Sequence, residues 1–335
     1  AAALRGAIHW RADDTTQPAG PVYPVPTGLW QPPAASLPTS GNYVYLKSDP
    51  GDYIGAGQTY LYTPRDFFIT VGASGGRATV SVDGWAGNFQ AMSTLAQLEP
   101  GYYGNLTRWP FHNPAKGGLD WSGQGRGCNT LTGWFAVDNV TWVGGTLTAI
   151  DIRFEQHCEG ATAALHGAIH WRADDTTQPA PPVYPVPAGL WQPPAGSLPA
   201  AGNYVYLQSD AGDYIGQGQT YLYAPPSAIV GLTASGGHVG VSVGDWFGDF
   251  QAMATLTQMQ PGYYGDLKRY PFHNPAKGGL DWFGQGRGCN TLTGWFAVDS
   301  ITWNGSTLTA LDLRFEQHCE GFTPALRGAI HWRAP

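Results

Sequence analysis

The chain has 335 residues and a formal net charge of −7 at pH 7, with 42% hydrophobic and only 12% charged residues. It has enough apolar residues to build a folded core, no cluster of Lys and Arg suited to nucleic acid, and no run of about 18 apolar residues that could span a membrane. The 47 glycines, 27 prolines and 13% aromatic residues, without a long apolar pattern of helical period, predict an all-β protein.

One decapeptide occurs three times in the chain. ALRGAIHWRA at 3–12 returns as ALHGAIHWRA at 164–173 and as ALRGAIHWRA at 325–334, at an unbroken offset of 161 residues. Such a period indicates a repeated domain, because solenoid and propeller repeats are about 20–50 residues long. The chain is therefore interpreted as two copies of one unit plus the beginning of a third, and each copy is long enough to close its own core.

We assign each decapeptide to the body that precedes it. It follows the stretch FEQHCEG almost directly, whereas a Pro-rich stretch separates it from the next body. Proline fixes φ and removes a backbone donor, so this stretch is interpreted as a semi-rigid linker. The predicted order is 1–12, C-terminal strand of a preceding repeat; 13–25, Pro-rich linker; 26–173, repeat 1; 174–186, Pro-rich linker; and 187–335, repeat 2.

Two alternatives to this organisation stay open. Each decapeptide could cross the linker and complete the body after it, and strand pairing distinguishes the two cases. The Pro-rich stretch could also pack along its own body as an ordered loop, for which Tyr23 and Trp30 supply apolar surface.

Alternating apolar and polar residues, bounded by Gly, Pro, Asn and Asp, predict the strands. The apolar stretch at 92–101 is the best helical candidate, and Pro100-Gly101 would end it. About seven or eight strands per unit predict two tandem antiparallel β-sandwich domains of jelly-roll or immunoglobulin-like kind, and the sequence does not choose between these topologies. The predicted strands of the first unit are 41–49, 58–63, 77–84, 85–92, 131–143, 146–157 and 165–172.

A long hairpin is predicted over 290–319. Asn304-Gly305 is a strong signal for a type I′ turn, and this turn pairs Trp303 with Ser306 and places Val298 opposite Leu311. In that register the two cysteines of the unit lie within one residue of being opposite. We therefore predict two disulfides, with buried free thiols as the alternative, and an extracellular protein, secreted or on the cell surface. The predicted bonds are Cys128–Cys158 and Cys289–Cys319.

No catalytic signature is present, so we expect no enzyme, no organic cofactor and no catalytic metal. The polar side chains Arg314, Glu316 and His318 are expected to have structural partners rather than to line a cavity. Paired aspartates in two turns are weak candidates for calcium, because one such turn supplies too few oxygen ligands. These candidates are Asp49, Asp52, Asp210 and Asp213.

The many aromatic residues raise the possibility of carbohydrate binding. Exposed Trp and Tyr can stack on sugar rings, and the alternative is that these side chains fill the core. Differences between the two copies gather in 63–88 against 224–249, which suits a spacer or a multivalent binder. The candidate glycan-binding residues are Trp85, Trp109, Trp121, Trp246, Tyr270 and Trp282.

The stretches GDYIGAGQTYLY, GRGCNTLTGWFAVD and LRFEQHCEG…ALRGAIHW resemble a tandem-repeat β-sandwich domain of large secreted bacterial surface or matrix proteins. The resemblance covers nearly all of each unit. It implies an extracellular bacterial origin and use in tandem, and it carries no established activity and no residue roles.

The hypothesis from the sequence is an extracellular structural or adhesive repeat protein that forms part of a stalk, fibre or matrix. Self-association would occur by addition of a decapeptide strand to the open sheet edge of a neighbouring molecule. The alternative is a multivalent array of carbohydrate-binding modules, and a hydrolase ranks third. The residues that would face a neighbouring sheet are Leu4, Ile8 and Trp10, with Leu326, Ile330 and Trp332 in the last copy.

Overall fold

The structure is a computed structural model, and it describes residues 6–9, 11–14 and 16–335 in two bodies. The first body holds strands β1–β10 and the second holds β11–β20. The described residues contain no α-helix, and a short 3-10 turn at Ala34–Ser36 is the one helical element among them. The prediction of two tandem all-β domains is confirmed.

Each body contains ten strands at equivalent positions of the two copies. Those of the first body are β1 Tyr43–Ser48, β2 Thr59–Tyr62, β3 Thr70–Ser74, β4 Arg77–Val82, β5 Trp85–Gln90, β6 Gly101–Arg108, β7 Gly118–Gly123, β8 Leu131–Val143, β9 Thr146–Cys158 and β10 Leu165–Arg172. Those of the second are β11 Tyr204–Ser209, β12 Thr220–Tyr223, β13 Gly231–Ser235, β14 His238–Val243, β15 Trp246–Gln251, β16 Gly262–Arg269, β17 Gly279–Gly284, β18 Leu292–Asn304, β19 Thr307–Cys319 and β20 Leu326–Arg333.

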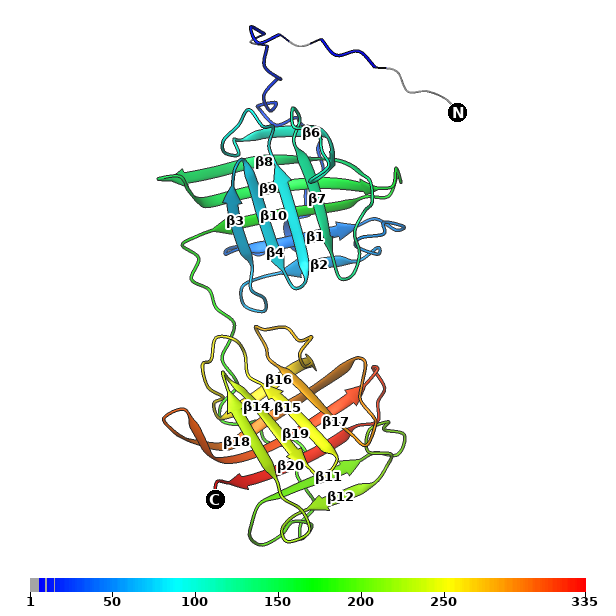
Figure 1. Cartoon of the computed structure of the whole chain (residues 1–335), viewed down its shortest axis with the longest axis vertical. Helices are drawn as coiled ribbons and strands as arrows, with labels where there is room; N and C mark the ends of the chain where they lie inside the picture. Colours follow the sequence, from blue (N-terminus) through cyan, green and yellow to red (C-terminus); the bar gives the residue numbers. More distant parts are fainter. Residues whose placement is uncertain (1–5, 10, 15) are drawn as a thin grey trace. The chain divides into compact units, whose positions relative to one another are not determined.

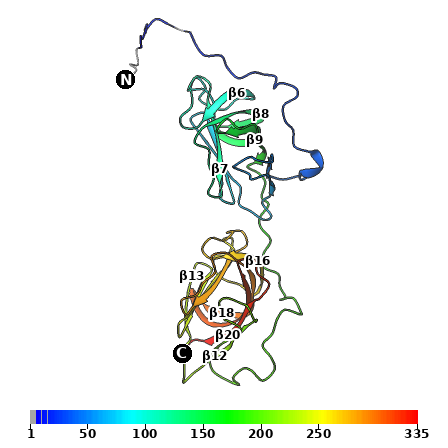
Figure 2. The same cartoon turned by 90° about the vertical axis from the view of Figure 1, so that its right-hand side faces the viewer.

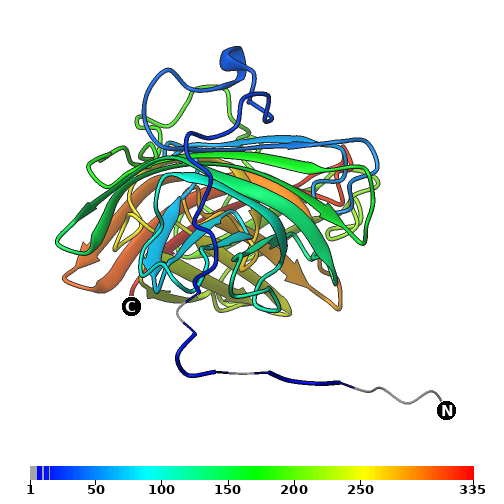
Figure 3. The ribbon, with the colours of Figure 1, turned by 90° about the horizontal axis from the view of Figure 1, so that it is seen from above.

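The ten strands of a body form one continuous sheet that folds over on itself. Its order in the first body is β2-β1-β10-β9-β8-β6-β7-β5-β4-β3, and every neighbouring pair is antiparallel except the short β6–β7 contact. The half that contains β3, β4 and β5 crosses over the long β8–β9 hairpin (Figure 1), and β3 lies against β9. The two layers of the sandwich are thus halves of one strongly curled sheet (Figure 3), whereas an immunoglobulin-like sandwich is built from two sheets.

The core lies between the two halves of the sheet. Strands place alternate side chains on opposite faces, and the inward positions carry large rings. In the first body Phe89 on β5 contacts Phe135 on β8 and Phe154 on β9, with ring centroids 5.6 and 5.4 Å apart. Trp121 on β7 stacks on Phe154 at 5.2 Å. These four side chains are fully buried, so they join the two halves of the sheet.

All seven predicted strand segments of the first unit are strands, whereas β3, β6 and β7 were not predicted. The best helical candidate, 92–101, is not a helix. Its residues form turns, in which the Leu95 N–H donates to the Met92 carbonyl and the Ser93 N–H to the Pro114 carbonyl. Met92 and Leu98 are buried, so the apolar spacing of this stretch reflects loop residues that pack into the core.

The predicted disulfides are confirmed, with Cα–Cα distances of 5.1 Å for Cys128–Cys158 and 5.2 Å for Cys289–Cys319. Each closes the open end of the β8–β9 or β18–β19 hairpin. Such a bond stabilises a domain by about 2–4 kcal/mol.

The predicted register of the second hairpin was wrong by two residues. Val298 lies opposite Leu313, and Asn304 pairs with Thr307, so the turn is Gly305-Ser306. Two bulges, between Val298 and Ser300 and between Thr302 and Trp303, each shift the ladder by one residue and cancel each other, so the error comes from the turn, which lies one residue further along the chain than Asn304-Gly305.

The disulfide forms in this different register because residues 289–291 leave the ladder. Cys319 lies opposite Leu292 rather than next to Cys289. The Glu320 carboxylate accepts hydrogen bonds from the N–H of Asn290 at 2.6 Å and from the Thr291 hydroxyl at 3.0 Å. The carboxylate thus ties the end of the loop that carries Cys289 to the residue after Cys319.

The second and third decapeptides complete the body before them, as predicted. β10 lies between β1 and β9, and β20 lies between β11 and β19. Leu326 and Ile330 are buried in the core of the second body, and Trp332 packs against it. For the first decapeptide, Leu4 and Trp10 lie outside the described residues, and Ile8 is 97% exposed and in no strand.

The Pro-rich stretches pack along their own bodies, which was the alternative for them. Val22 pairs with Tyr102 at the start of β6 through backbone bonds of 3.0 and 2.8 Å, and Val183 pairs with Tyr263 in the same way. Trp30 stacks on His166 at 5.0 Å, so it covers the outer face of β10. Figure 2 shows each stretch following the outside of its sheet. The linker boundaries at 13–25 and 174–186 stay predictions.

Beside β7, a buried glutamine side chain makes the backbone hydrogen bonds that a neighbouring strand would otherwise make. β6 pairs with β7 only at Thr107 and Arg108, which leaves the backbone of Trp121 without a neighbour on that side. Gln156 on β9 is fully buried, and its Nε2 donates to the Trp121 carbonyl at 2.8 Å while its Oε1 accepts from the Trp121 N–H at 2.9 Å.

We predict that Gln156→Leu destabilises the first body by about 2–5 kcal/mol, since two buried backbone groups lose their partners. Urea unfolding of the full chain measures the loss of stability, and hydrogen exchange in β9 and β19 assigns that loss to the first or the second body. Gln317→Leu is the matched control, because Gln317 makes the same two bonds to Trp282 and should affect the second body alone. Equal stability of wild type and Gln156→Leu would contradict the account.

The decapeptide copies at 164–173 and 325–334 differ at one position, His166 in the first body and Arg327 in the second. His166 Nδ1 lies 3.2 Å from Glu155 Oε2, and its Nε2 lies 3.5 Å from Asp49. Burial disfavours the imidazolium, but these carboxylates outweigh burial and raise the pKa of His166. The hydrogen bond from His166 in turn lowers the pKa of Glu155 to about 2.

We predict that the first body loses stability as the pH rises from the ordinary histidine pKa of 6.5 through the raised pKa of His166, while the second body does not. A raised histidine pKa stabilises the fold fully below the ordinary pKa, and this contribution is lost as the pH rises through the folded-state pKa. Thermal unfolding across this range, with exchange in β9 and β19 to assign each body, tests the prediction. His166→Arg should remove the difference, and a difference that persists in this variant would refute the role of His166.

Candidate functional site

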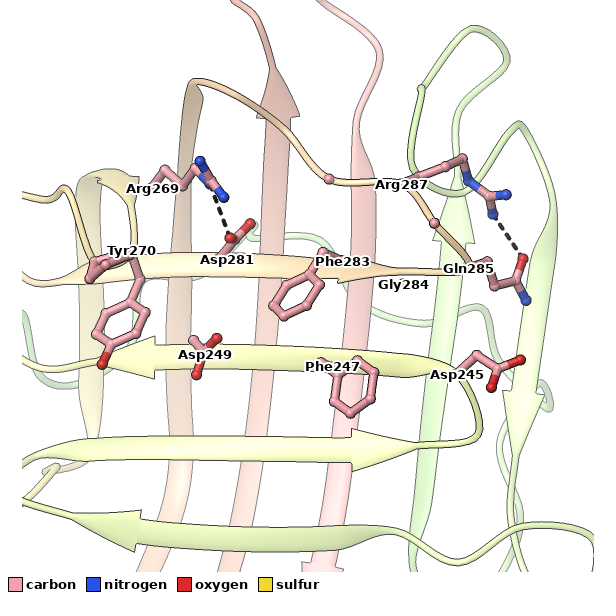
Figure 4. A pocket seen from close by; sticks show the side chains of 13 residues that line it. Asp245, Phe247, Asp249, Arg269, Tyr270, Asp281, Phe283, Gly284, Gln285 and Arg287 are labelled. Carbon is pink, nitrogen blue, oxygen red and sulfur yellow. Dashed lines mark hydrogen bonds and ion pairs between the residues drawn. The ribbon is translucent and has the colours of Figure 1, made fainter.

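The second body has a groove on its outer surface, over β15 and β17, with a volume of about 740 Å³ (Figure 4). The residues come from the turn before β15, from β15 and β17, from the end of β16 and from the segments that follow β16 and β17. They are Asp245, Phe247, Asp249, Arg269, Tyr270, Pro271, Asp281, Phe283, Gly284, Gln285, Gly286, Arg287 and Gly288.

Strand alternation explains why these side chains face outward. On β15, Trp246 and Phe250 are fully buried, so Phe247 and Asp249 between them point away from the core. β17 repeats the pattern, with Trp282 buried between two groove residues. β15 and β17 are direct antiparallel neighbours, which brings their outward residues side by side.

Two phenylalanines form the apolar floor of the groove. Phe247 and Phe283 are cross-strand partners, with ring centroids 5.7 Å apart and planes at 26°. Phe247 is 47% exposed. An exposed pair of rings on a rigid sheet provides a preformed apolar platform.

Beside the floor lies a pair of aspartates. Asp249 and Asp281 are the next cross-strand partners along β15 and β17. Asp249 Oδ1 lies 2.8 Å from His238 Nε2, and Arg269 Nε donates to Asp281 at 3.2 Å. Burial raises the pKa of Asp281; the Arg269 guanidinium opposes this effect, and the charge of Asp249 adds to it.

The rims of the groove are held by stacking and by hydrogen bonds. Tyr270 stacks on His238 at 4.9 Å and on His273 at 5.6 Å. Burial, together with the nearby His238, lowers the pKa of His273. At the other end Arg287 Nε donates to the Ile215 carbonyl at 2.7 Å, and its Nη2 donates to Gln285 at 2.9 Å. The groove therefore offers fixed donors and acceptors around an apolar floor.

Four of the six predicted glycan-binding residues were wrong, because their side chains are at most 1% exposed and fill the two cores. These are Trp85, Trp121, Trp246 and Trp282. Trp109 and its equivalent Tyr270 are partly exposed, and Tyr270 lines the groove. Sequence reasoning missed Phe247, Phe283 and Asp249. The one available signal was the concentration of differences between the copies at 224–249, a range that contains two of these three residues.

The four aspartates that were candidates for calcium make hydrogen bonds or ion pairs within the protein. Asp52 is buried and its carboxylate accepts bonds from Ser48 Oγ at 2.7 Å and from the Gly55 N–H at 2.7 Å, and Asp213 repeats this arrangement. Asp210 pairs with Arg327 at 2.7 Å, and Asp49 accepts from the Ala164 N–H. Carboxylate oxygens that face N–H donors are poorly placed for a cation. No group of three or more His, Cys, Asp or Glu in the described part of the chain could hold a metal ion.

The polar cluster around the second hairpin has structural partners, as predicted. Arg314 makes two bonds to Asp299, at 2.7 and 2.6 Å, and donates to the Trp191 carbonyl at 2.6 Å. Glu316 accepts from Arg327 at 2.5 Å, and His318 Nε2 lies 3.3 Å from Glu316. These contacts join β19 to its neighbours and to the Pro-rich stretch.

No family model, no curated protein and no solved structure matches this chain. The resemblance to repeat domains of secreted bacterial proteins therefore stays a prediction. The two disulfides indicate an oxidising environment. Among the described residues, no helix has both the length and the apolar character needed to cross a membrane.

Proposed function

We propose that this chain is an extracellular adhesive repeat protein whose second body binds carbohydrate in the groove over β15 and β17. The observation that carries the proposal is the exposed Phe247–Phe283 platform with charged side chains on either side of it. Sugar rings present C–H faces that pack on aromatic rings and hydroxyl groups that bond to carboxylates and guanidinium groups.

The aspartates and arginines of the groove suit binding of hydroxyl groups. Asp249 and Asp281 each already have a cationic or histidine partner, which fixes their orientation. A carboxylate held in this way accepts a hydrogen bond from a sugar hydroxyl without first losing side-chain freedom.

Adhesion by such a protein follows from its tandem construction and its compartment. An open groove on a sheet surface binds one sugar segment weakly, and display of many copies of the chain on one surface would raise the overall avidity through effective concentration. Secretion or display on the cell surface is consistent with one disulfide in each body.

Self-association by the first decapeptide stays a prediction. The sheet position for this sequence is occupied in both bodies, by β10 between β1 and β9 and by β20 between β11 and β19. Pairing there with a second copy would require β10 or β20 to leave its place. Open edges remain at β2, β3, β12 and β13.

The test is a glycan array followed by titration of a glycan that the full chain retains. We predict that Phe247→Ala combined with Phe283→Ser weakens binding at least about tenfold, because each ring buries apolar area worth roughly 1–2 kcal/mol. The substitutions copy Ala86 and Ser122, which occupy these positions in the first body.

Phe111→Ala is the matched control, because this ring is 77% exposed and lies in the first body. It should leave the affinity unchanged. No retained glycan, or equal affinity in the double variant, would refute the proposal. Release of new reducing ends from the bound glycan would instead identify a hydrolase.

A further inference from the structure

The two copies differ where the groove lies and agree in the core beneath it. Five of the thirteen groove positions differ between the bodies, and the other eight are identical. The inward residues of the same strands are unchanged, for example Trp85 and Trp246, or Phe89 and Phe250. The five differing pairs are Gly84 and Asp245, Ala86 and Phe247, Asn88 and Asp249, Trp109 and Tyr270, and Ser122 and Phe283.

These differences change the sign of the net charge on the outer face that forms the groove. In the second body three aspartates, Asp245, Asp249 and Asp281, outnumber Arg269 and Arg287. At the equivalent positions and next to them, the first body has three arginines against two aspartates. Its charged residues are Arg77, Arg108, Arg126, Asp83 and Asp120.

One position, Asp249 in the second body and Asn88 in the first, determines whether the side chain beside it is paired with a carboxylate. The first residue of β4 or β14 packs on the aromatic residue after β6 or β16 in both bodies: the Arg77 guanidinium lies 4.6 Å from the Trp109 ring centroid, and His238 stacks on Tyr270 at 4.9 Å. In the second body, Asp249 binds His238. In the first body the equivalent of Asp249 is Asn88, which brings no charge.

Arg77 therefore keeps its charge available. In the described part of the chain Arg77 forms no ion pair with a carboxylate, and its side chain is partly exposed, while its Nε is buried without a hydrogen-bond partner. By contrast, Arg108 lies 3.6 Å from Asp120, and Arg126 Nε donates to the Ile54 carbonyl at 2.6 Å. A guanidinium that lies on an indole ring is held in place, and its planar fork matches a carboxylate.

We propose that the outer face of the first body, around Arg77 and Trp109, is a second glycan site that selects sugars bearing a carboxylate, such as a uronic acid. The carboxylate binds the Arg77 guanidinium, and the sugar ring packs beside Trp109. Asn88 allows this binding because an aspartate there would repel the ligand. The proposal goes beyond the proposed function, because it concerns a different site, on the first body, and gives the two bodies different ligands.

The test uses the full chain and two probes, a galacturonate oligomer and its methyl ester, which differ in charge. We predict that the wild type binds one acidic oligomer per chain, that the ester binds at least about tenfold more weakly, and that salt weakens the acidic complex. Arg77→His combined with Asn88→Asp, the residues of the second body, should also lower affinity for the acid at least about tenfold.

The mirror variant, His238→Arg with Asp249→Asn, should bind a second acidic oligomer per chain. Thermal unfolding checks that both variants are folded. Equal affinity of the wild type for acid and ester, or unchanged affinity in the loss variant, would overturn the proposal. So would the absence of a second equivalent in the mirror variant, because specificity would then depend on other residues.

The two proposals fail in different ways. Loss of a retained neutral glycan in the Phe247→Ala, Phe283→Ser variant reports on the second body, whereas acid binding that depends on Arg77 reports on the first. Acid binding without any retained neutral glycan would therefore refute the proposed function and support this inference.

Discussion

Alternation along the strands is the constraint on which the rest of the structure depends. Each strand gives one set of side chains to the interior and the other set to the outer face. The interior sets from the two halves of the folded sheet meet in a layer of rings, such as Phe89, Phe135 and Phe154. A change at an inward position therefore disturbs both halves, whereas a change at an outward position alters only the surface.

The two outer faces of each body differ in whether the Pro-rich stretch covers them. The face over β1, β9 and β10 is covered by the Pro-rich stretch, with Trp30 on His166 and the Trp30 carbonyl bonded to Arg153. Among the described residues, none covers the face over β5 and β7, or β15 and β17, in this way, and this face forms the groove in the second body. Divergence between the copies at this open face leaves the inward residues of β5 and β7 unchanged in β15 and β17, which would allow one repeated fold to carry the two ligand specificities that we propose.

Much of the fold could be predicted from local pattern. The long hairpin, its disulfide and the decapeptide strand all follow from residues near each other in the sequence. The strands β3, β6 and β7 were missed because they are short or contain several glycines, and the hairpin register was missed because the turn lies at Gly305-Ser306, one residue beyond the Asn-Gly signal.

The site was harder to predict than the fold. β15 pairs with β17 and not with β16, so Phe247 and Phe283 meet across a connection that the sequence does not reveal. Composition also cannot separate Trp246, which is buried in the core, from Tyr270, which is partly exposed on the surface. The drift at 224–249 was visible in the sequence, but its location on an open face required the structure.

The central claim is that the divergent outer face of the sheet is the ligand-binding face. Hydrogen exchange of the full chain, with and without a glycan that it retains, tests this claim most directly. The account predicts slower exchange in the second body at the Gln285–Gly288 loop and around Asp245 and Phe247, which line the groove. Protection confined to the covered face over β19 and β20, or to the Pro-rich stretch, would contradict it.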